Sequence, residues 1–262
     1  MNQILQNPIP NRIGQPLNSQ TLRQIPQRQQ GAFSAQTILQ VGKPCDMTSR
    51  NQGHPTLQSS VSVRERVAQM PPTPVQHKQR AFGNGQVLQK GQKFALGQVQ
   101  NVEVLVGWDV KRSDVDVDIS AFMLDNNRRI IGDDWFVFYG SCHSPDRSIH
   151  LITDGLRTDD KSMQIRLSQV HPQVERIVFV LTIDEALRQS LNFSMVDHAY
   201  IRLVSGGKEL ARFLLTEYYD TVTSMMLGEL YRHNGMWKFN PIGDGVAKDL
   251  EGLCHMYGVQ TT

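Results

Sequence analysis

The chain has 262 residues and divides by composition into two unequal parts. Residues 1–80 contain nine of the twelve prolines, fifteen glutamines and one aromatic side chain, and they carry a formal charge of +7, whereas residues 81–262 carry −5. A segment so poor in apolar side chains cannot bury enough surface to offset the entropy lost on ordering, which excludes it as a core-forming unit. The composition therefore predicts a disordered, basic Pro/Gln-rich tail over 1–80 and one globular domain over 81–262.

Signals for a membrane or an export route are missing from the sequence. No stretch reaches the roughly 18 consecutive apolar residues that cross a bilayer, and residues 1–14 lack the apolar segment of a signal peptide. The cysteines lie too far apart for a C-x-x-C metal clamp. We expect a cytoplasmic protein. A basic tail can contact nucleic acid or anionic lipid, but a solvated linker is the interpretation that we favour, so we do not expect nucleic acid as a partner.

From residue 102 onward, short runs rich in Val, Ile, Phe and Tyr alternate with turn residues. This pattern predicts many short strands and hence a mainly β fold, a sandwich or a barrel. The firmest local prediction is the last hairpin, because Asn234-Gly235 suits a two-residue type I′ turn. In chain order, the expected strands are 102–108, 116–124, 136–139, 148–153, 163–167, 176–183, 199–204, 209–215, 225–231 and 236–240.

Helices are expected at few places. In the tail, 60–70 has a short helical spacing that ends at three prolines. The segment 184–190 follows a predicted strand, with Asp184 as its N-cap. At the end of the chain, Val246, Leu250, Leu253 and Tyr257 recur at helical spacing before Gly258, which predicts an amphipathic terminal helix with a glycine stop.

The chemistry, if there is any, lies in the carboxylates. Asp114, Asp116 and Asp118 alternate with apolar residues, so in an extended strand they share one face and repel one another. A bound cation would relieve that repulsion, and oxygen-rich clusters suit calcium or magnesium. The alternative is a solvated acidic strand edge that discourages aggregation. Further candidates for such a metal site are Asp133, Asp154, Asp159 and Asp160.

Signatures of catalysis are not found in the sequence. It contains no P-loop, no dinucleotide-binding glycine motif, no Gly-x-Ser-x-Gly and no His-Glu-x-x-His. The aspartate run is not an EF-hand either, because Ile119 stands where that loop needs glycine. We therefore do not expect an enzyme.

Several motifs together resemble a known family. Gly107-Trp108-Asp109 follows the first strong strand, and Asp114-Val-Asp116-Val-Asp118-Ile-Ser follows that. The most specific block is Leu227-Gly-Glu-Leu-Tyr-Arg-His-Asn-Gly235, followed by Trp237. In this order, across 88–259, the motifs resemble the TerD domain of tellurium-resistance and stress-response proteins.

The resemblance implies a two-sheet β-sandwich that binds calcium in an acidic loop region. It also implies a non-enzymatic role in bacterial resistance to tellurite and related stress, with other stress-resistance proteins as partners, in a complex that lies at the inner face of the membrane. The added N-terminal segment makes the chain resemble a divergent, TerA-like member.

The departures from the family bear on the metal. The Asn-Asn that usually follows the family's tyrosine is Gly140-Ser141 here, and the long acidic loop shrinks to Thr158-Asp-Asp-Lys161. Fewer carboxylates and a nearby lysine should weaken a calcium site. A structural scaffold that has lost its metal and acts only through protein contacts is therefore the alternative.

Overall fold

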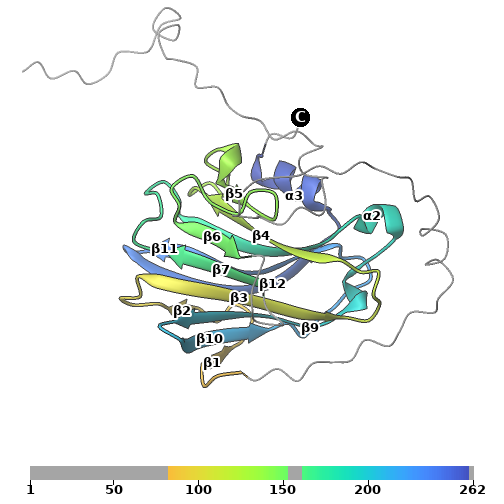
Figure 1. Ribbon diagram of the computed structural model, residues 1–262, viewed down its shortest axis with the longest axis horizontal. Coiled ribbons are helices and arrows are strands. Elements are labelled where there is room, and N and C mark those ends of the chain that lie inside the picture. The colour runs from red at the N-terminus through yellow and green to blue at the C-terminus, as the bar shows by residue number, and fades with distance from the viewer. Residues whose placement is uncertain (1–81, 153–160, 260–262) are drawn as a thin grey trace, which may run out of the picture. The chain divides into compact units, whose positions relative to one another are not determined.

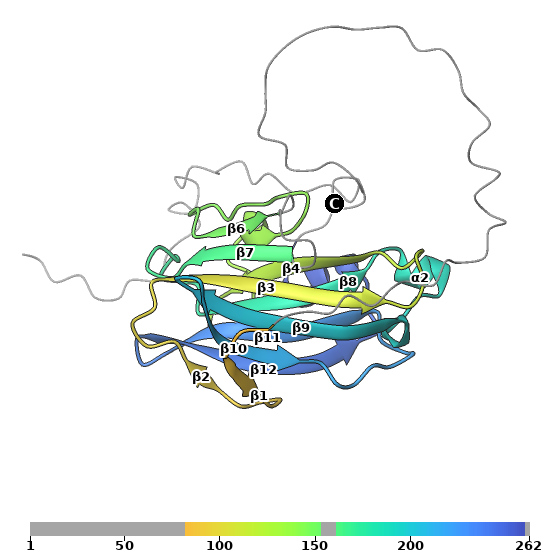
Figure 2. The same cartoon turned by 60° about the horizontal axis from the view of Figure 1, so that its bottom comes forward.

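Two six-stranded β-sheets lie face to face in residues 82–152 and 161–259, the part of the chain that the computed structural model describes (Figures 1 and 2). All strand pairs are antiparallel except β1 with β10. The first sheet has the order β1 (Gln86–Leu88), β10 (Lys208–Leu214), β9 (Val196–Ser205), β3 (Asn101–Val110), β7 (Lys161–Arg166) and β6 (Ile149–Ile152). The second has the order β2 (Phe94–Ala95), β12 (Met236–Val246), β11 (Ser224–His233), β8 (Arg176–Ile183), β4 (Val117–Leu124) and β5 (Phe136–Val137).

The main core fills the space between the two sheets. Alternate residues of each strand point into it, such as Val104 and Val106 of β3 and Val117 and Ile119 of β4, all at most 3 % exposed. The period of two that marks these strands in the sequence is thus the period with which their side chains meet the opposite sheet.

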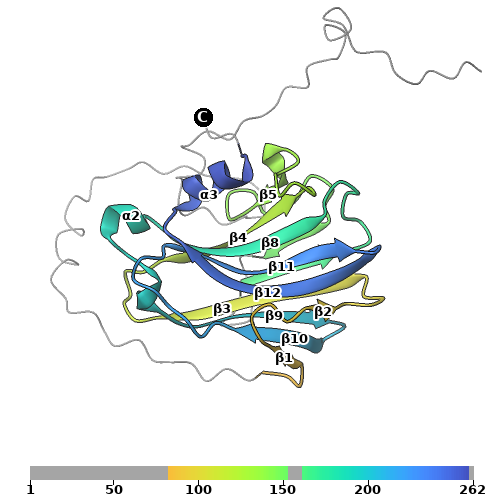
Figure 3. The same ribbon diagram turned by 180° about the vertical axis from the view of Figure 1, so that it is seen from behind.

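A second, smaller core covers the outer face of the second sheet. The terminal helix α3 (Leu250–Tyr257) lies over β4 and β8 (Figure 3). Its Leu253 and Tyr257 belong to one buried cluster with Phe122 and Val180. Because β8 is covered on both faces, nearly all of its residues are buried. This explains why β8 reads as a continuous apolar run rather than an alternating one.

The mainly β, two-sheet fold predicted from the sequence is confirmed, and each of the ten expected strands overlaps an observed one. The two strands that the sequence did not predict, β1 and β2, have three and two residues and lie at sheet edges. Such short segments carry too few alternating positions to produce a signal.

Two details of the expected helices are wrong. Helix α2 is only Ala186–Gln189 and its N-cap is Glu185, so Asp184 is not a helix cap. Val246 is the last residue of β12 rather than part of the terminal helix, which starts at Leu250 after the N-cap Asp249. The glycine stop is confirmed, since Gly258 has a φ of 89°. Two single-turn 3-10 helices, η3 (Asp133–Trp135) and η4 (Phe193–Met195), were not predicted.

The last hairpin is formed as expected. His233 pairs with Met236, and the two turn residues Asn234 and Gly235 have φ of 52° and 73°, as a type I′ turn requires. Within the described residues no helix has the length and apolar character needed to cross a bilayer. The predicted tail over 1–80, with its short helix at 60–70, lies outside the described residues.

Candidate functional site

Two of the three alternating aspartates lie at the start of β4. The strand begins at Val117, whose buried side chain and that of Ile119 turn inward. Asp116 and Asp118 therefore face outward, with Asp116 exposed and Asp118 half-buried. Their shared face follows from the strand period, as the sequence predicted.

The pairing of β4 with β8 brings a third carboxylate to this place. Asp118 lies opposite Thr182, and the backbone N–H of Asp184 donates to the carbonyl oxygen of Asp116 at 2.9 Å. Asp184 comes directly after β8 and lies beside Asp116, which directly precedes the neighbouring strand β4. The cluster Asp116, Asp118 and Asp184, called the acidic cluster below, is built across two strands.

Crowding of these groups changes their acidity. Burial raises the pKa of Asp118 to about 6, and the carboxylates of Asp116 and Asp184 act in the same direction, while Lys161 opposes them. Burial also raises the pKa of Asp184, with Glu185 and Asp116 adding to the rise. Nearby Tyr139 responds likewise: burial and the cluster's negative charge raise its pKa to about 12. The acidic cluster therefore carries unfavourable negative charge that a cation would relieve.

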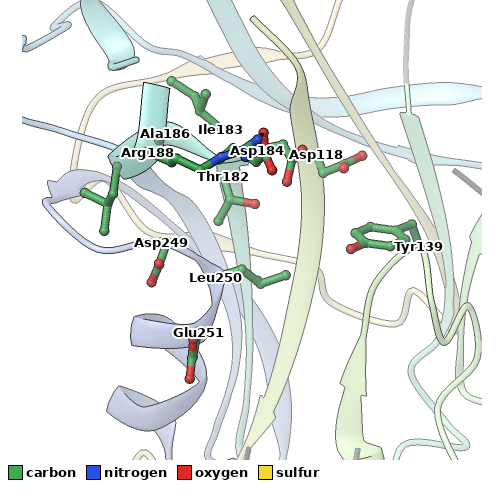
Figure 4. A pocket seen from close by; sticks show the side chains of 12 residues that line it. Asp118, Tyr139, Thr182, Ile183, Asp184, Ala186, Arg188, Asp249, Leu250 and Glu251 are labelled. Atoms are coloured by element: carbon green, nitrogen blue, oxygen red, sulfur yellow. Dashed lines mark hydrogen bonds and ion pairs between the residues drawn. The ribbon is translucent and has the colours of Figure 1, made fainter. Parts of the chain in front are cut away.

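A pocket of about 360 Å³ opens beside the cluster. Figure 4 shows Asp118 and Asp184 next to Thr182, with Tyr139 on one side and the first residues of α3 on the other. Its described lining contains carboxylates and hydroxyl groups together with Arg188, which pairs with Glu185, and it contains no histidine or cysteine. Such a set of oxygen donors suits hard cations, which prefer oxygen ligands.

The other predicted ligands do not join this cluster. Asp114 lies in a turn before β4, and its carboxylate accepts hydrogen bonds from Arg112, which lower its pKa. Asp114 does not continue the face of Asp116 and Asp118, because it lies in the turn closed by the hydrogen bond from the Val115 N–H to the Arg112 carbonyl oxygen. Asp133 belongs to η3 and lies near Cys254 of α3, whose pKa it helps to raise, after burial and Glu251. Asp154, Asp159 and Asp160 lie outside the described residues.

The site offers the kind of ligand atom that calcium prefers, but too few of them for a complete coordination shell. The acidic cluster and the Thr182 hydroxyl are all oxygen donors, but calcium takes six to eight. In 82–152 and 161–259, no group of three or more His, Cys, Asp or Glu side chains is already placed to hold a metal ion. Lys161, the first residue of β7, carries a positive charge that acts on Asp118.

Sequence reasoning missed Asp184 and Tyr139. Asp184 looked like a helix cap, because an aspartate after a strand and before a short polar stretch is typical of a helix start. Its position directly after the buried strand β8 was the available signal, but its partner Asp116 lies far away in sequence. Tyr139 was expected only as the last residue of the strand 136–139, and it lies half-buried at the pocket.

Comparison with known proteins agrees with the fold and the motifs. The TerD domain profile matches residues 85–257. The chain is similar to the tellurium resistance protein TerD of Serratia marcescens, at 40% identity over 67% of this chain and 98% of that protein. It is also similar to general stress protein 16U of Bacillus subtilis, at 35% identity over 66% of this chain and 97% of that protein. The similarity to the tellurium resistance protein TerA of an Alcaligenes species is 32% over 47% of this chain and 34% of that protein. The chain belongs to the TerD family of tellurium-resistance and stress-response proteins.

Proposed function

We propose that this TerD domain binds calcium at the acidic cluster and acts without catalysis, as an interaction module in stress resistance. The observation that carries the proposal is the position of Asp118, half-buried beside two further carboxylates, which raises its pKa to about 6. Without a cation, ionising Asp118 at neutral pH costs free energy, and a divalent ion would remove that cost.

The non-enzymatic part of the proposal is supported by the composition of the pocket. A nucleophilic mechanism needs a nucleophile and a base within hydrogen-bond reach of each other. In the described lining of the pocket, Thr182 offers a hydroxyl opposite Asp118, and there is no histidine or cysteine to serve as a base or as a thiol nucleophile. Other stress-resistance proteins, in a complex at the inner face of the membrane, are the partners that we propose for the module.

A scaffold without metal is the second candidate, and two observations favour it. Lys161 already supplies positive charge close to Asp118. The described donors also fall short of a complete calcium shell. In this case the domain would act through protein contacts only.

Calcium titration followed by thermal melting separates the two candidates. A ligand that binds only the native state adds about 2.7 kcal/mol at a hundredfold excess over its Kd. We therefore expect the Tm to rise by roughly 5–10 °C in millimolar calcium and to fall back on addition of EDTA. In Asp116→Asn/Asp118→Asn the rise should shrink strongly.

The matched control is Asp220→Asn, which removes an exposed carboxylate in the turn before β11. This variant should keep the full calcium response. A melting curve of the unaltered chain that ignores both calcium and EDTA would leave the metal-free scaffold as the function. Tellurite resistance of cells that carry each variant would then show whether the cluster matters for the biological role.

A further inference from the structure

A pair of stacked histidines lies on the first sheet, away from the acidic cluster. His143 and His150 are partners in an antiparallel bridge, and both are half-buried. Their rings lie nearly parallel, with centroids 4.1 Å apart and planes inclined by 11°. His150 in turn lies opposite Gln164 of β7, so polar side chains continue across three neighbouring segments.

The hairpin that carries the pair is held firmly. Asp146 Oδ1 accepts hydrogen bonds from the Ser144 hydroxyl at 2.7 Å and the Ser148 N–H at 2.9 Å, and its Oδ2 accepts from the His171 N–H at 2.9 Å. The hydroxyl of Ser144 also accepts from the N–H of Ile149 at 2.9 Å. Asp146 is the only carboxylate of this turn, and its hydrogen bonds are made to groups other than the histidine rings.

The charged groups that act on the rings are arginines. Burial lowers the pKa of His143, and His150 and Arg147 lower it further. Burial likewise lowers the pKa of His150, with Arg166 and Arg147 adding to the effect. Arg147 comes from the turn between the two histidines, and Arg166 lies on β7 on the same outward face as Gln164. No carboxylate contributes to either shift.

This arrangement favours an anion over a metal ion. Two neutral imidazoles on adjacent strands could hold a transition metal, but two guanidinium groups nearby would repel it. An oxyanion would instead receive charge-assisted hydrogen bonds from the arginines and, once they are protonated, from the imidazoles. We propose that His143, Arg147, His150 and Arg166 form a binding site for a tetrahedral or pyramidal oxyanion, such as a phosphate group.

Binding should strengthen as the pH falls, because each imidazole that gains a proton adds a donor and a positive charge. The first test uses the full chain and follows the side-chain ¹H–¹⁵N signals of its histidines during titration with sodium sulfate, with sodium chloride keeping the ionic strength constant. Sulfate stays divalent throughout, so any pH dependence belongs to the protein. We expect the signals of His143 and His150 to shift, with tighter binding at a pH of about 6 than at about 8.

Variants locate the site. Arg147 has a φ of 58°, so Arg147→Asn removes the charge with a residue that tolerates this backbone. It should weaken sulfate binding roughly tenfold, the loss of one charge-assisted hydrogen bond, and Arg166→Gln should weaken it in the same direction. Lys208→Gln is the control, since it removes an exposed positive charge from β10 of the same sheet and should leave binding unchanged.

The source of the anion is distinguished by two more titrations. Inorganic phosphate tests for a free anion, and phosphatidylcholine vesicles with or without phosphatidic acid test for a lipid headgroup. Binding that is weakened in Arg147→Asn and unchanged in Lys208→Gln supports the site in either case and identifies its source. The proposal is overturned if no oxyanion shifts the two histidine signals, if Lys208→Gln weakens binding as much as Arg147→Asn, or if zinc alone shifts them.

Discussion

Asp118 is the residue on which the proposed calcium site depends, and its acidity gives a test that needs no calcium. Its folded pKa of about 6 lies above the ordinary value of 3.8. A carboxyl group with a raised folded pKa stabilises the native state at low pH, and this contribution is lost as the pH rises through the folded value. In EDTA, the free energy of unfolding should therefore fall between a pH of about 4 and about 7, by on the order of 1–2 kcal/mol after solvent screening.

Urea denaturation of the unaltered chain and of Asp118→Asn, over the same pH range, measures this effect. The amide cannot ionise, so the variant should lack most of the decline and should be the more stable protein near neutral pH. Calcium should reverse the order, because it stabilises only the chain that keeps the carboxylate. An identical decline in both proteins would mean that ionisation of Asp118 does not destabilise the native state.

How much of the site the sequence predicts depends on how far apart its members are. Asp116 and Asp118 could be placed on one face because alternation within a strand is local. Asp184 could not, since its contact with Asp116 comes from the pairing of β4 with β8. The glycine at position 140 has a reason in packing, because a Cβ there would lie 2.6 Å from the ring of Phe138.

At the scale of an element, the hairpin of β11 and β12 combines a predicted turn with contacts that the sequence did not reveal. Trp237 is only 8 % exposed and belongs to the main core. The guanidinium of Arg232 lies 4.6 Å from the centre of its ring and donates to the carbonyl oxygens of Val174 and Val170 at 2.9 and 2.8 Å. Arg232 therefore ties the hairpin to the loop before β8 and is not an exposed recognition residue.

Trp237→Ala should cost about 3–5 kcal/mol of stability, as removal of a large buried ring usually does. His233, exposed beside the turn, should tolerate replacement by alanine within about 0.5 kcal/mol. Chemical denaturation of both variants, with tellurite resistance measured in cells, tests this assignment. Loss of resistance in His233→Ala with normal melting would show that the hairpin tip is a binding site.

Sequence patterns predicted the long elements well and the short or ambiguous ones poorly. Strands such as β8 and β11 have eight and ten residues, long enough for their apolar pattern to stand out. Val246 fits the helical spacing of Leu250 and Leu253, yet it pairs with Ser224 and so ends β12. Periodicity alone could not decide between the two, because one apolar residue at a boundary fits either pattern.

At the scale of the whole molecule, the start of the domain is fixed by a buried charge. Glu209 is only 8 % exposed and pairs with Arg212 at 2.6 Å. Its other carboxylate oxygen accepts from the N–H of Gly83 at 2.8 Å, while Arg212 donates to the carbonyl oxygen of Gly83 at 2.8 Å. The ring of Phe82 lies against Tyr200 with centroids 5.1 Å apart. Residues 82–85 are therefore structurally part of the domain.

This anchoring predicts where truncation begins to matter. Removal of residues 1–80, which lack core-forming side chains, should change the free energy of unfolding by no more than roughly 1 kcal/mol. Removal of residues 1–85 should cost about 1–3 kcal/mol more, because Glu209 then loses a hydrogen-bond donor inside a buried site. Denaturant unfolding of the two truncated chains beside the full chain provides the comparison.

Glu209→Gln, placed in the chain that starts at residue 81, separates the buried charge from the loss of chain itself. An amide still accepts a hydrogen bond from Gly83 but no longer pairs with Arg212 as an ion, so the variant should be less stable than its parent. In the chain that starts at residue 86 the same substitution should cost less, since part of the network is already gone. Equal costs in both chains would mean that Gly83 and Glu209 contribute independently, and that this network does not anchor residues 82–85. A large loss on removal of 1–80 alone would instead mean that the predicted tail takes part in the fold.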